Sequence, residues 1–259
     1  MKKANYRNIA SNYDSGRHVA NQNLAIWLQL ISQIVGDRKN VKLLDLGCGT
    51  GRFSIPIATK LKYTVVGADN SKEMLQVAEE KDKRNKVIWD YQKAPNLSYL
   101  SKEFDVVFMS HLLHHLDDPL ETIRECFRVL QPGGVLINRY GAIEDIIIDP
   151  EHYFFPQAIE LDRVRTPSKK QVEKWFKQAG FININSSTSV QRYYKSPRNR
   201  LKRIKQKYTS VLTLISKTSF QQGLAKIEKH LLKHPHERRF LIDKITLTNA
   251  LVPKKGKIE

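Results

Sequence analysis

The feature that most constrains the fold is a regular alternation of short apolar segments with helical ones. The apolar segments lie at residues 41–46, 63–69, 86–90, 104–110 and 134–140, and helical patterns separate most of them. Short strands without polar alternation are typical of parallel sheets, because the crossover helices of βαβ units cover both faces. The alternation therefore predicts an α/β chain with a doubly wound, mostly parallel sheet.

Further elements lie on either side of this core. Apolar residues at helical spacing predict an amphipathic helix over 24–35. Ser168 and Gly180 mark the start and the end of another helix, because serine caps helix N-termini and glycine ends helices. Segments 181–194 and 243–252 are predicted as two more strands, which brings the sheet to seven.

Two insertions interrupt the rhythm after Tyr140. Residues 141–167 contain three prolines and an aromatic cluster, and we predict an irregular segment there. From Ser196 to about Ile215, apolar residues at helical spacing predict an amphipathic helix with a cationic outer face, followed by a helix near 219–233. We expect the insertions and the N-terminal helices to form an α-rich cap over the cleft.

Composition places the chain among globular proteins of a reducing compartment. With 41% hydrophobic residues there is enough apolar material for a core. The two cysteines, Cys48 and Cys126, form no disulfide framework and have no zinc-like spacing. The basic N-terminus is followed by polar residues, and no run approaches the roughly 18 apolar residues of a membrane span. We therefore expect a cytoplasmic protein without a membrane span.

Positive charge is concentrated in the C-terminal half. Lys and Arg number 44 against 26 Asp and Glu, a net charge of +18. Between Glu173 and Glu228 there are twelve basic residues and no acidic one, and eight of the twelve lie from Arg192 to Lys207. Such a segment attracts anions. Three interpretations remain open: a solvated helix face, a lid that receives an acidic substrate, or a grip on RNA phosphates.

The most informative motif is the glycine-rich turn after the first strand, DLGCGTG at 45–51. A dinucleotide fingerprint would need a small residue where Arg52 stands, and the acid at Asp45 favours a cation such as an amino group over a phosphate. Eighteen residues beyond Gly51, Asp69 ends the second strand, where a carboxylate can accept both hydroxyls of a ribose. These residues predict a pocket for a nucleoside that carries an amino acid, which describes S-adenosylmethionine.

With these motifs the chain resembles the class I S-adenosylmethionine-dependent methyltransferases, and among them those related to ubiquinone and menaquinone biosynthesis. The resemblance implies a Rossmann-like methyltransferase fold, with S-adenosylmethionine as cofactor and S-adenosylhomocysteine as product. Its matching pieces are DLGCGTG (45–51), GADNSKEML (67–75), FDVVFMSHLLHHLDDP (104–119) and RVLQPGGVLI (128–137), with weaker matches at KWFKQAGF (174–181) and SNYD (11–14).

On this basis the chain divides into a core and a cap. The core, in three pieces, would hold the cofactor and the sheet, and the cap would come from the N-terminus and the two insertions. The predicted units are 1–36 (N-terminal helices of the cap), 37–140 (cofactor-binding core), 141–167 (cap insertion), 168–192 (core helix and strand), 193–240 (basic helical cap insertion) and 241–259 (last strand and tail).

The resemblance also implies a set of cofactor contacts. The glycine turn would line the methionine part, with Asp45 orienting the turn or the amino group. Asp69 would hold the ribose, the end of the third strand would meet the adenine, and the N-terminal segment would close over the sulfonium. The implied residues are Tyr13, Arg17, Asp45, Gly47, Cys48 (through its backbone), Gly49, Asp69, Asn70, Met74, Asp90, Tyr91 and Ser110.

Catalysis of methyl transfer needs little beyond alignment, because the sulfonium is already activated. A general base is required only if the acceptor loses a proton, and His111 or His115 could serve. Both could equally be histidines that only contact the cofactor or pack in the core. The HxxHH spacing of His111, His114 and His115 lacks acidic or cysteine partners, so we predict no metal site.

The predicted function is methyl transfer from S-adenosylmethionine to a small-molecule acceptor, for which the basic cap suggests an anion. Two alternatives remain open. The chain could be a tRNA or rRNA methyltransferase that grips RNA with its cationic helix, although no known RNA-binding module is present. It could also be a protein that binds S-adenosylmethionine without transferring the methyl group.

Overall fold

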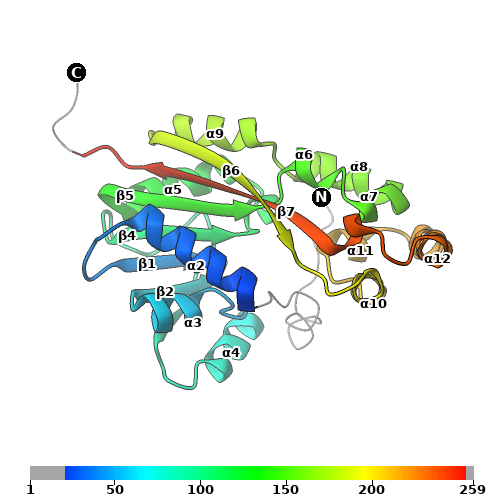
Figure 1. Cartoon of the computed structure of the whole chain (residues 1–259). Helices are drawn as coiled ribbons and strands as arrows, with labels where there is room; N and C mark the ends of the chain where they lie inside the picture. Colours follow the sequence, from blue (N-terminus) through cyan, green and yellow to red (C-terminus); the bar gives the residue numbers. More distant parts are fainter. Residues whose placement is uncertain (1–20, 255–259) are drawn as a thin grey trace.

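Seven strands form one sheet in residues 21–254, the part of the chain that the structure, a computed structural model, describes. The strand order is β3-β2-β1-β4-β5-β7-β6, and β7 runs antiparallel to both of its neighbours (Figure 1). The predicted doubly wound, mostly parallel sheet is therefore confirmed. The strands are β1 (Lys42–Leu46), β2 (Thr64–Asp69), β3 (Val87–Tyr91), β4 (Phe104–Ser110), β5 (Leu130–Tyr140), β6 (Ile182–Arg192) and β7 (Ile242–Leu251).

Helices cover both faces of the sheet and bury a separate apolar core on each. On one face, Trp27 and Ile31 of α2 pack with Val65 and Val106 of the sheet. On the other, Phe176 of α9 packs with the helix α5 and the strands. The helices in these layers are α2 (Asn21–Val35), α3 (Ser54–Pro56), the π-helical turn η1 (Ile57–Leu61), α4 (Lys72–Lys81), α5 (Pro119–Val129) and α9 (Lys169–Gln178).

The packing of α2 corrects one predicted boundary. Residues 1–36 were assigned to the cap, but the apolar stripe of α2 is buried against the sheet, where Trp27 is 1% and Ile31 0% exposed. A helix with that stripe gains more by covering a sheet than by lying over an open cleft, because burying each large apolar side chain stabilises by about 1.5–3 kcal/mol. Residues 1–20, which include the predicted contacts Tyr13 and Arg17, lie outside the described residues.

The cap consists of helices joined by turns, which corrects two further predictions. The segment 141–167 is not irregular, because Pro150 and Pro156 occupy first turns, where proline fits a helix. The single helix predicted from Ser196 is broken after Lys205. The cap helices are α6 (Ile143–Ile146), α7 (Pro150–Phe154), α8 (Pro156–Arg165), α10 (Pro197–Lys205), α11 (Ser210–Leu214) and α12 (Lys217–Lys233), followed by the 3-10 turn η3 (Arg238–Leu241).

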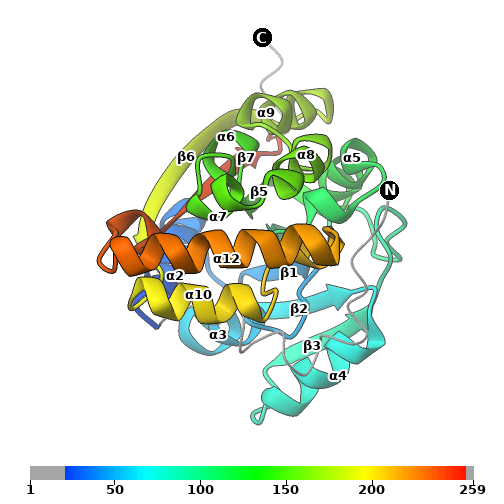
Figure 2. The same ribbon diagram turned by 90° about the vertical axis from the view of Figure 1, so that its right-hand side faces the viewer.

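The two insertions pack on each other and form a third apolar core. Figure 2 shows α10 and α12 lying side by side, with α7 next to α12; α8 packs against α7 and α11. Phe155 from the first insertion is buried with Phe220 and Ile227 from the second. At Gly223 a Cβ would lie 2.2 Å from Cε1 of Phe155, so the absence of a side chain lets α12 approach this ring. The cap is therefore a unit with its own core.

In the described residues 21–254, no helix is both long enough and apolar enough to cross a membrane.

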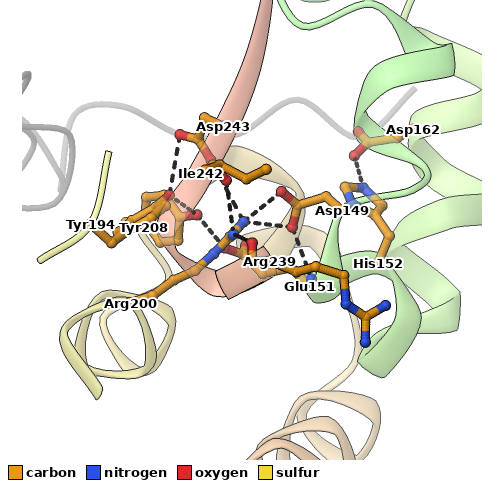
Figure 3. Close-up of polar contacts among 10 residues, drawn as sticks. All are labelled: Asp149, Glu151, His152, Asp162, Tyr194, Arg200, Tyr208, Arg239, Ile242 and Asp243. Carbon is orange, nitrogen blue, oxygen red and sulfur yellow. Dashed lines mark hydrogen bonds and ion pairs between the residues drawn. The ribbon is translucent and has the colours of Figure 1, made fainter. Parts of the chain in front are cut away.

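A buried arginine joins the cap to the sheet (Figure 3). Arg200 of α10 is 1% exposed, and its Nη2 lies 2.5 and 2.6 Å from the carboxylate oxygens of Asp149, just before α7. Its Nε donates to Glu151 over 2.8 Å, and Nη2 lies 3.7 Å from Asp243 of β7. Burial raises the pKa of Asp243 to about 7, although the charge of Arg200 lowers it. Three carboxylates thus share one guanidinium.

We expect Arg200→Ala to destabilise the protein strongly, because it leaves buried carboxylates without their cation. The loss should be about 3–5 kcal/mol, since breaking a buried ion pair from one side costs that much. Thermal denaturation should show a melting temperature lower by about 10 °C. Arg198→Ala, at an exposed position of the same helix, is the control and should change stability by less than about 0.5 kcal/mol. Equal melting temperatures for both variants would contradict this role.

Candidate functional site

The glycine turn after β1 is shaped by what surrounds each glycine. Gly51 has φ +71°, and a Cβ there would lie 2.4 Å from Cη2 of Trp89 on β3. Gly49 also has a positive φ, of +55°, but a Cβ there would meet nothing within 4 Å. The turn therefore packs tightly on one side and borders open space at Gly49, where a ligand can approach the backbone.

The N–H groups of the turn are used inside the protein. Gly47 and Cys48 both donate to the carbonyl of Ala68 at the end of β2, over 2.8 and 3.0 Å. Gly49 donates to Oδ2 of Asp69 over 2.8 Å, and Gly51 donates to the carbonyl of Cys48 over 3.1 Å. A diphosphate would need such N–H groups as donors. This turn therefore does not offer these four donors to a diphosphate.

Two carboxylates stand beside the turn. Asp45 is 2% exposed and accepts a hydrogen bond of 2.5 Å from Ser54. Burial raises the pKa of Asp45 to about 7, and the charge of Asp69 raises it further against the effect of Ser54. Burial also raises the pKa of Asp69 above its usual value, although the N–H groups of Gly49 and Ser71 lower it. Two crowded carboxylates favour a bound cation, which would relieve their mutual repulsion.

Asp69 connects the loops that follow β1 and β2. Its Oδ2 accepts from Gly49, and its Oδ1 accepts from the N–H of Ser71 over 2.9 Å. Each carboxylate oxygen has a second lone pair, so these bonds leave capacity for a hydroxyl ligand. The side chain is partly exposed. Asp69 therefore lies at the predicted place, with a supporting role in the turn that the sequence did not reveal.

Cys48 behaves as a small buried residue. Its side chain is 8% exposed, and burial raises the pKa of the thiol well above its usual value. A thiol with a raised pKa is a poor nucleophile, since the thiolate is the reactive form. Its backbone N–H donates to the carbonyl of Ala68, so a ligand contact through the backbone would use another atom.

The residues predicted to meet the adenine lie around the ends of β2 and β3. Strand register pairs Asp69 with Tyr91, which is 50% exposed. Asp90 accepts from Gln92 over 2.8 Å and from the hydroxyl of Tyr99 over 2.9 Å. These two donors were missed, and the only signal was the unusual Tyr-Gln-Lys sequence after Asp90. Of the other two predicted contacts, Asn70 is exposed at the loop and Met74 is 4% exposed on the first turn of α4.

A second group of polar side chains lies after β4 and β5. Ser110, which ends β4, accepts from Nη1 of Arg139 over 3.2 Å. His111 has φ +57° and donates its N–H to the carbonyl of Arg139 over 2.8 Å. The guanidinium of Arg139 also lies over the ring of Trp27, 4.6 Å from its centroid. Arg139 was not predicted, although a single charge inside the apolar strand GVLINRY was a signal.

A cavity of about 180 Å³ extends from these residues to the cap. On the sheet side it is lined by His111, His114 and Arg139. On the cap side its wall contains Arg200 with its three carboxylates and the pair of His152 and Asp162. A volume of about 10–15 Å³ holds one water, and an apolar cavity of about 150 Å³ holds benzene, so a small molecule fits here. The sequence could not reveal this cavity, because it joins residues more than 100 positions apart, such as His111 and Asp243.

Of the two predicted histidines, only His111 lines the cavity. His115 lies on the 3-10 turn η2 (Leu113–His115), and its ring centroid is 3.9 Å from that of His114. Within residues 21–254, no group of three His, Cys, Asp or Glu side chains is arranged to hold a metal ion.

Comparisons with known proteins agree with this geometry. A family model described as "Methyltransferase domain" matches residues 44–138, from β1 to β5. Demethylmenaquinone methyltransferase from Staphylococcus aureus is 26% identical over 202 residues, which cover 69% of this chain and 84% of that protein.

Solved structures share the fold. A putative methyltransferase from an antibiotic biosynthesis pathway of Anabaena variabilis superimposes with a TM-score of 0.73 at 17% identity, covering 87% of this chain and 96% of that chain. Phosphoethanolamine N-methyltransferase 2 from Haemonchus contortus, in complex with S-adenosyl-L-methionine, gives a TM-score of 0.64 at 22% identity. That match covers 96% of this chain and 57% of the other, so this chain spans little more than half of that enzyme.

Three observations lead to one assignment. The N–H groups of the turn are already bonded within the protein, two carboxylates lie beside the turn, and the family model matches the same strands. The chain is an S-adenosylmethionine-dependent methyltransferase, and it is similar to the class I methyltransferases of quinone biosynthesis.

Proposed function

We propose that the chain transfers a methyl group from S-adenosylmethionine to a small-molecule acceptor that binds in the cavity between the sheet and the cap. The observation that carries this proposal is the cavity itself, which begins at His111 beside the end of β4 and continues to the cap helices. The donor pocket and the acceptor cavity would then meet at the residues that follow β4, where His111 and Ser110 lie.

The donor pocket would use the carboxylates and the open side of the turn. Asp45 would favour the amino group of the methionine part, and Asp69 would accept hydrogen bonds from the ribose. Asp90 and Tyr91 would border the adenine, and Gly49 would leave room for the chain of the ligand. The bound donor supplies a methyl group on a positively charged sulfur, ready for displacement.

For the acceptor, the cavity wall favours a polar molecule over a simple anion. Five carboxylates and five Arg or Lys residues line it, so the positive excess of the chain is not reproduced there. The basic segment places most of its positive charge on the protein surface, since Arg198, Lys202 and Lys205 are exposed. Arg200 is buried and bound by carboxylates. The named relatives act on demethylmenaquinone and phosphoethanolamine, which makes these two molecules the first acceptors to test.

Replacing Asp69 tests the donor pocket. Asp69→Asn keeps the shape but loses the charge, and Asp69→Ala also frees the N–H of Gly49. Hydrogen bonds to charged groups contribute about 1.5–3 kcal/mol, so calorimetry should show S-adenosylhomocysteine affinity lower by about 10- to 100-fold in both variants. Asp37→Asn, before β1, is the control. Unchanged affinity in both Asp69 variants would refute the ribose assignment.

The raised pKa of Asp45 makes donor binding depend on pH. A ligand amino group favours the ionised carboxylate, which is present above a pKa of about 7 and lost as the pH falls through it. Binding below that pH therefore requires a proton to leave Asp45. Calorimetry with S-adenosylhomocysteine should show affinity about tenfold weaker at pH 5.5 than at pH 7.5. Asp45→Asn should bind S-adenosylhomocysteine more weakly, and its affinity should depend much less on pH. If the affinity of this variant depended on pH as strongly as that of wild type, a group other than Asp45 would be responsible.

The methyl-transfer reaction is tested by measuring S-adenosylhomocysteine formation. Reduced demethylmenaquinone, phosphoethanolamine and a panel of small phenols and amines are offered as acceptors, and total tRNA is offered separately. We expect turnover with a small molecule and none with tRNA, and Asp69→Ala should turn over about 10- to 100-fold more slowly at S-adenosylmethionine concentrations well below the wild-type KM. Turnover with tRNA alone, falling steeply with salt, would support an RNA substrate instead. No turnover with any acceptor would support a protein that only binds the donor.

A further inference from the structure

A histidine and a carboxylate form a buried pair in the cap wall of the cavity. His152 of α7 and Asp162 of α8 both line the cavity, and Nε2 of His152 lies 2.7 Å from Oδ2 of Asp162 (Figure 3). The two residues are 8% and 3% exposed. Nothing in the sequence motifs pointed to them, because both belong to the insertion 141–167.

The second nitrogen of this histidine is left without a partner. Nδ1 of His152 is buried and has no hydrogen-bond partner among residues 21–254. Because the carboxylate accepts at Nε2, the neutral ring carries its hydrogen there and presents a lone pair at Nδ1. A buried acceptor without a donor is unfavourable, and a ligand that supplies an N–H or O–H would satisfy it.

The carboxylate is itself held in place. Oδ1 of Asp162 accepts from Nε of Arg165 over 2.6 Å, and Nη2 of Arg165 donates to Ser210 of α11 over 3.0 Å. Asp162 therefore has one oxygen committed to Arg165 and the other to His152. This arrangement fixes the ring and would stabilise the imidazolium that forms when Nδ1 takes up a proton.

A second His–carboxylate pair in the cap lacks these properties. His230 of α12 is paired with Glu237 in the same manner, but it does not line the cavity. Its side chain is 25% exposed, and its ring packs against Phe154 and His234. The pair in the cavity wall differs in its burial and in the unpartnered second nitrogen of its histidine.

We propose that His152 is the proton acceptor for the methyl acceptor of this enzyme, and that Asp162 positions it. The proposal rests on the proposed function. A hydroxyl or amine of the acceptor attacks the methyl carbon, the new bond to carbon forms, and the carbon–sulfur bond breaks with its electron pair passing to sulfur. The proton of the hydroxyl or amine passes to Nδ1 of His152. The acceptor class is therefore a molecule with an ionisable O–H or N–H nucleophile.

Nitrogen NMR of protein with ¹⁵N-labelled histidine tests the site without turnover. The ring-nitrogen signals that disappear in His152→Gln are assigned to His152. In the wild-type protein we expect these signals to show that the ring hydrogen of His152 is on Nε2. Phenol, which fits a cavity of this size and has one O–H, should shift the Nδ1 resonance, whereas toluene, of the same shape without a donor, should not. Asp162→Asn should change the tautomer signature. Hydrogen on Nδ1, or equal effects of phenol and toluene, would overturn the proposal.

Kinetics supply the second readout, with the acceptor that gives turnover in the assay above. In His152→Gln the amide can still donate to Asp162, but the base is gone. We expect kcat to fall by about 100-fold, within the range for general-base catalysis, while KM for S-adenosylmethionine changes by less than about threefold. His230→Gln is the matched control and should keep wild-type kcat. A wild-type kcat in His152→Gln would overturn the proposal, while the methyltransferase function would stand. Absence of all turnover in wild type would refute that function, and the NMR result would then decide on His152.

Discussion

The site depends on one carboxylate that joins two loops. Asp69 accepts N–H groups from Gly49 in the loop after β1 and from Ser71 in the loop after β2, so a single side chain at the end of β2 sets the distance between them. The parallel register brings these loops to the same edge of the sheet. With the N–H groups of Gly47 and Cys48 directed to Ala68, the turn is held by the protein alone and presents negative charge to a ligand. This distinguishes it from a turn built to hold a diphosphate.

The cap depends on a different kind of interaction. Its apolar core joins the two insertions, and Arg200 then ties them to β7 through carboxylates at the start of α7 and on β7. A buried ion cluster is a weak source of net stability compared with apolar packing, but it is sensitive to geometry, because each carboxylate must meet the guanidinium. These residues lie in the wall of the cavity, so the geometry of the ion cluster contributes to the shape of the cavity.

The two polar regions divide the work of the enzyme as we propose it. The edge formed by β1, β2 and β3 would bind the donor, and the cap would bind the acceptor and receive its proton. The boundary between them lies after β4, where His111 adopts a positive φ and hydrogen-bonds to Arg139. A strained non-glycine residue at such a place persists only when its surroundings hold it, and here the adjacent strand does so.

Local sequence patterns predicted most of the cofactor-binding core. The strand ends at Leu46, Asp69, Ser110 and Tyr140, the capping serine Ser168 and the motif at 45–51 were predictable, because each rests on neighbouring residues and on the periods of helix and strand. Prediction failed where a residue's role depends on distant parts of the chain. Proline in a first turn was mistaken for irregular structure at Pro150, and the apolar stripe of α2 could not say which surface it would cover.

By itself, the sequence determined the reaction class, because a strand, a glycine turn and an acid at the next strand end form one local unit that the parallel sheet always assembles in the same way. Only the tertiary structure decided what lies opposite that unit. The cavity joins His111 and Arg139 to Asp149, His152 and Asp243, and the positions of these residues follow from how two insertions fold on each other, which no short-range pattern encodes.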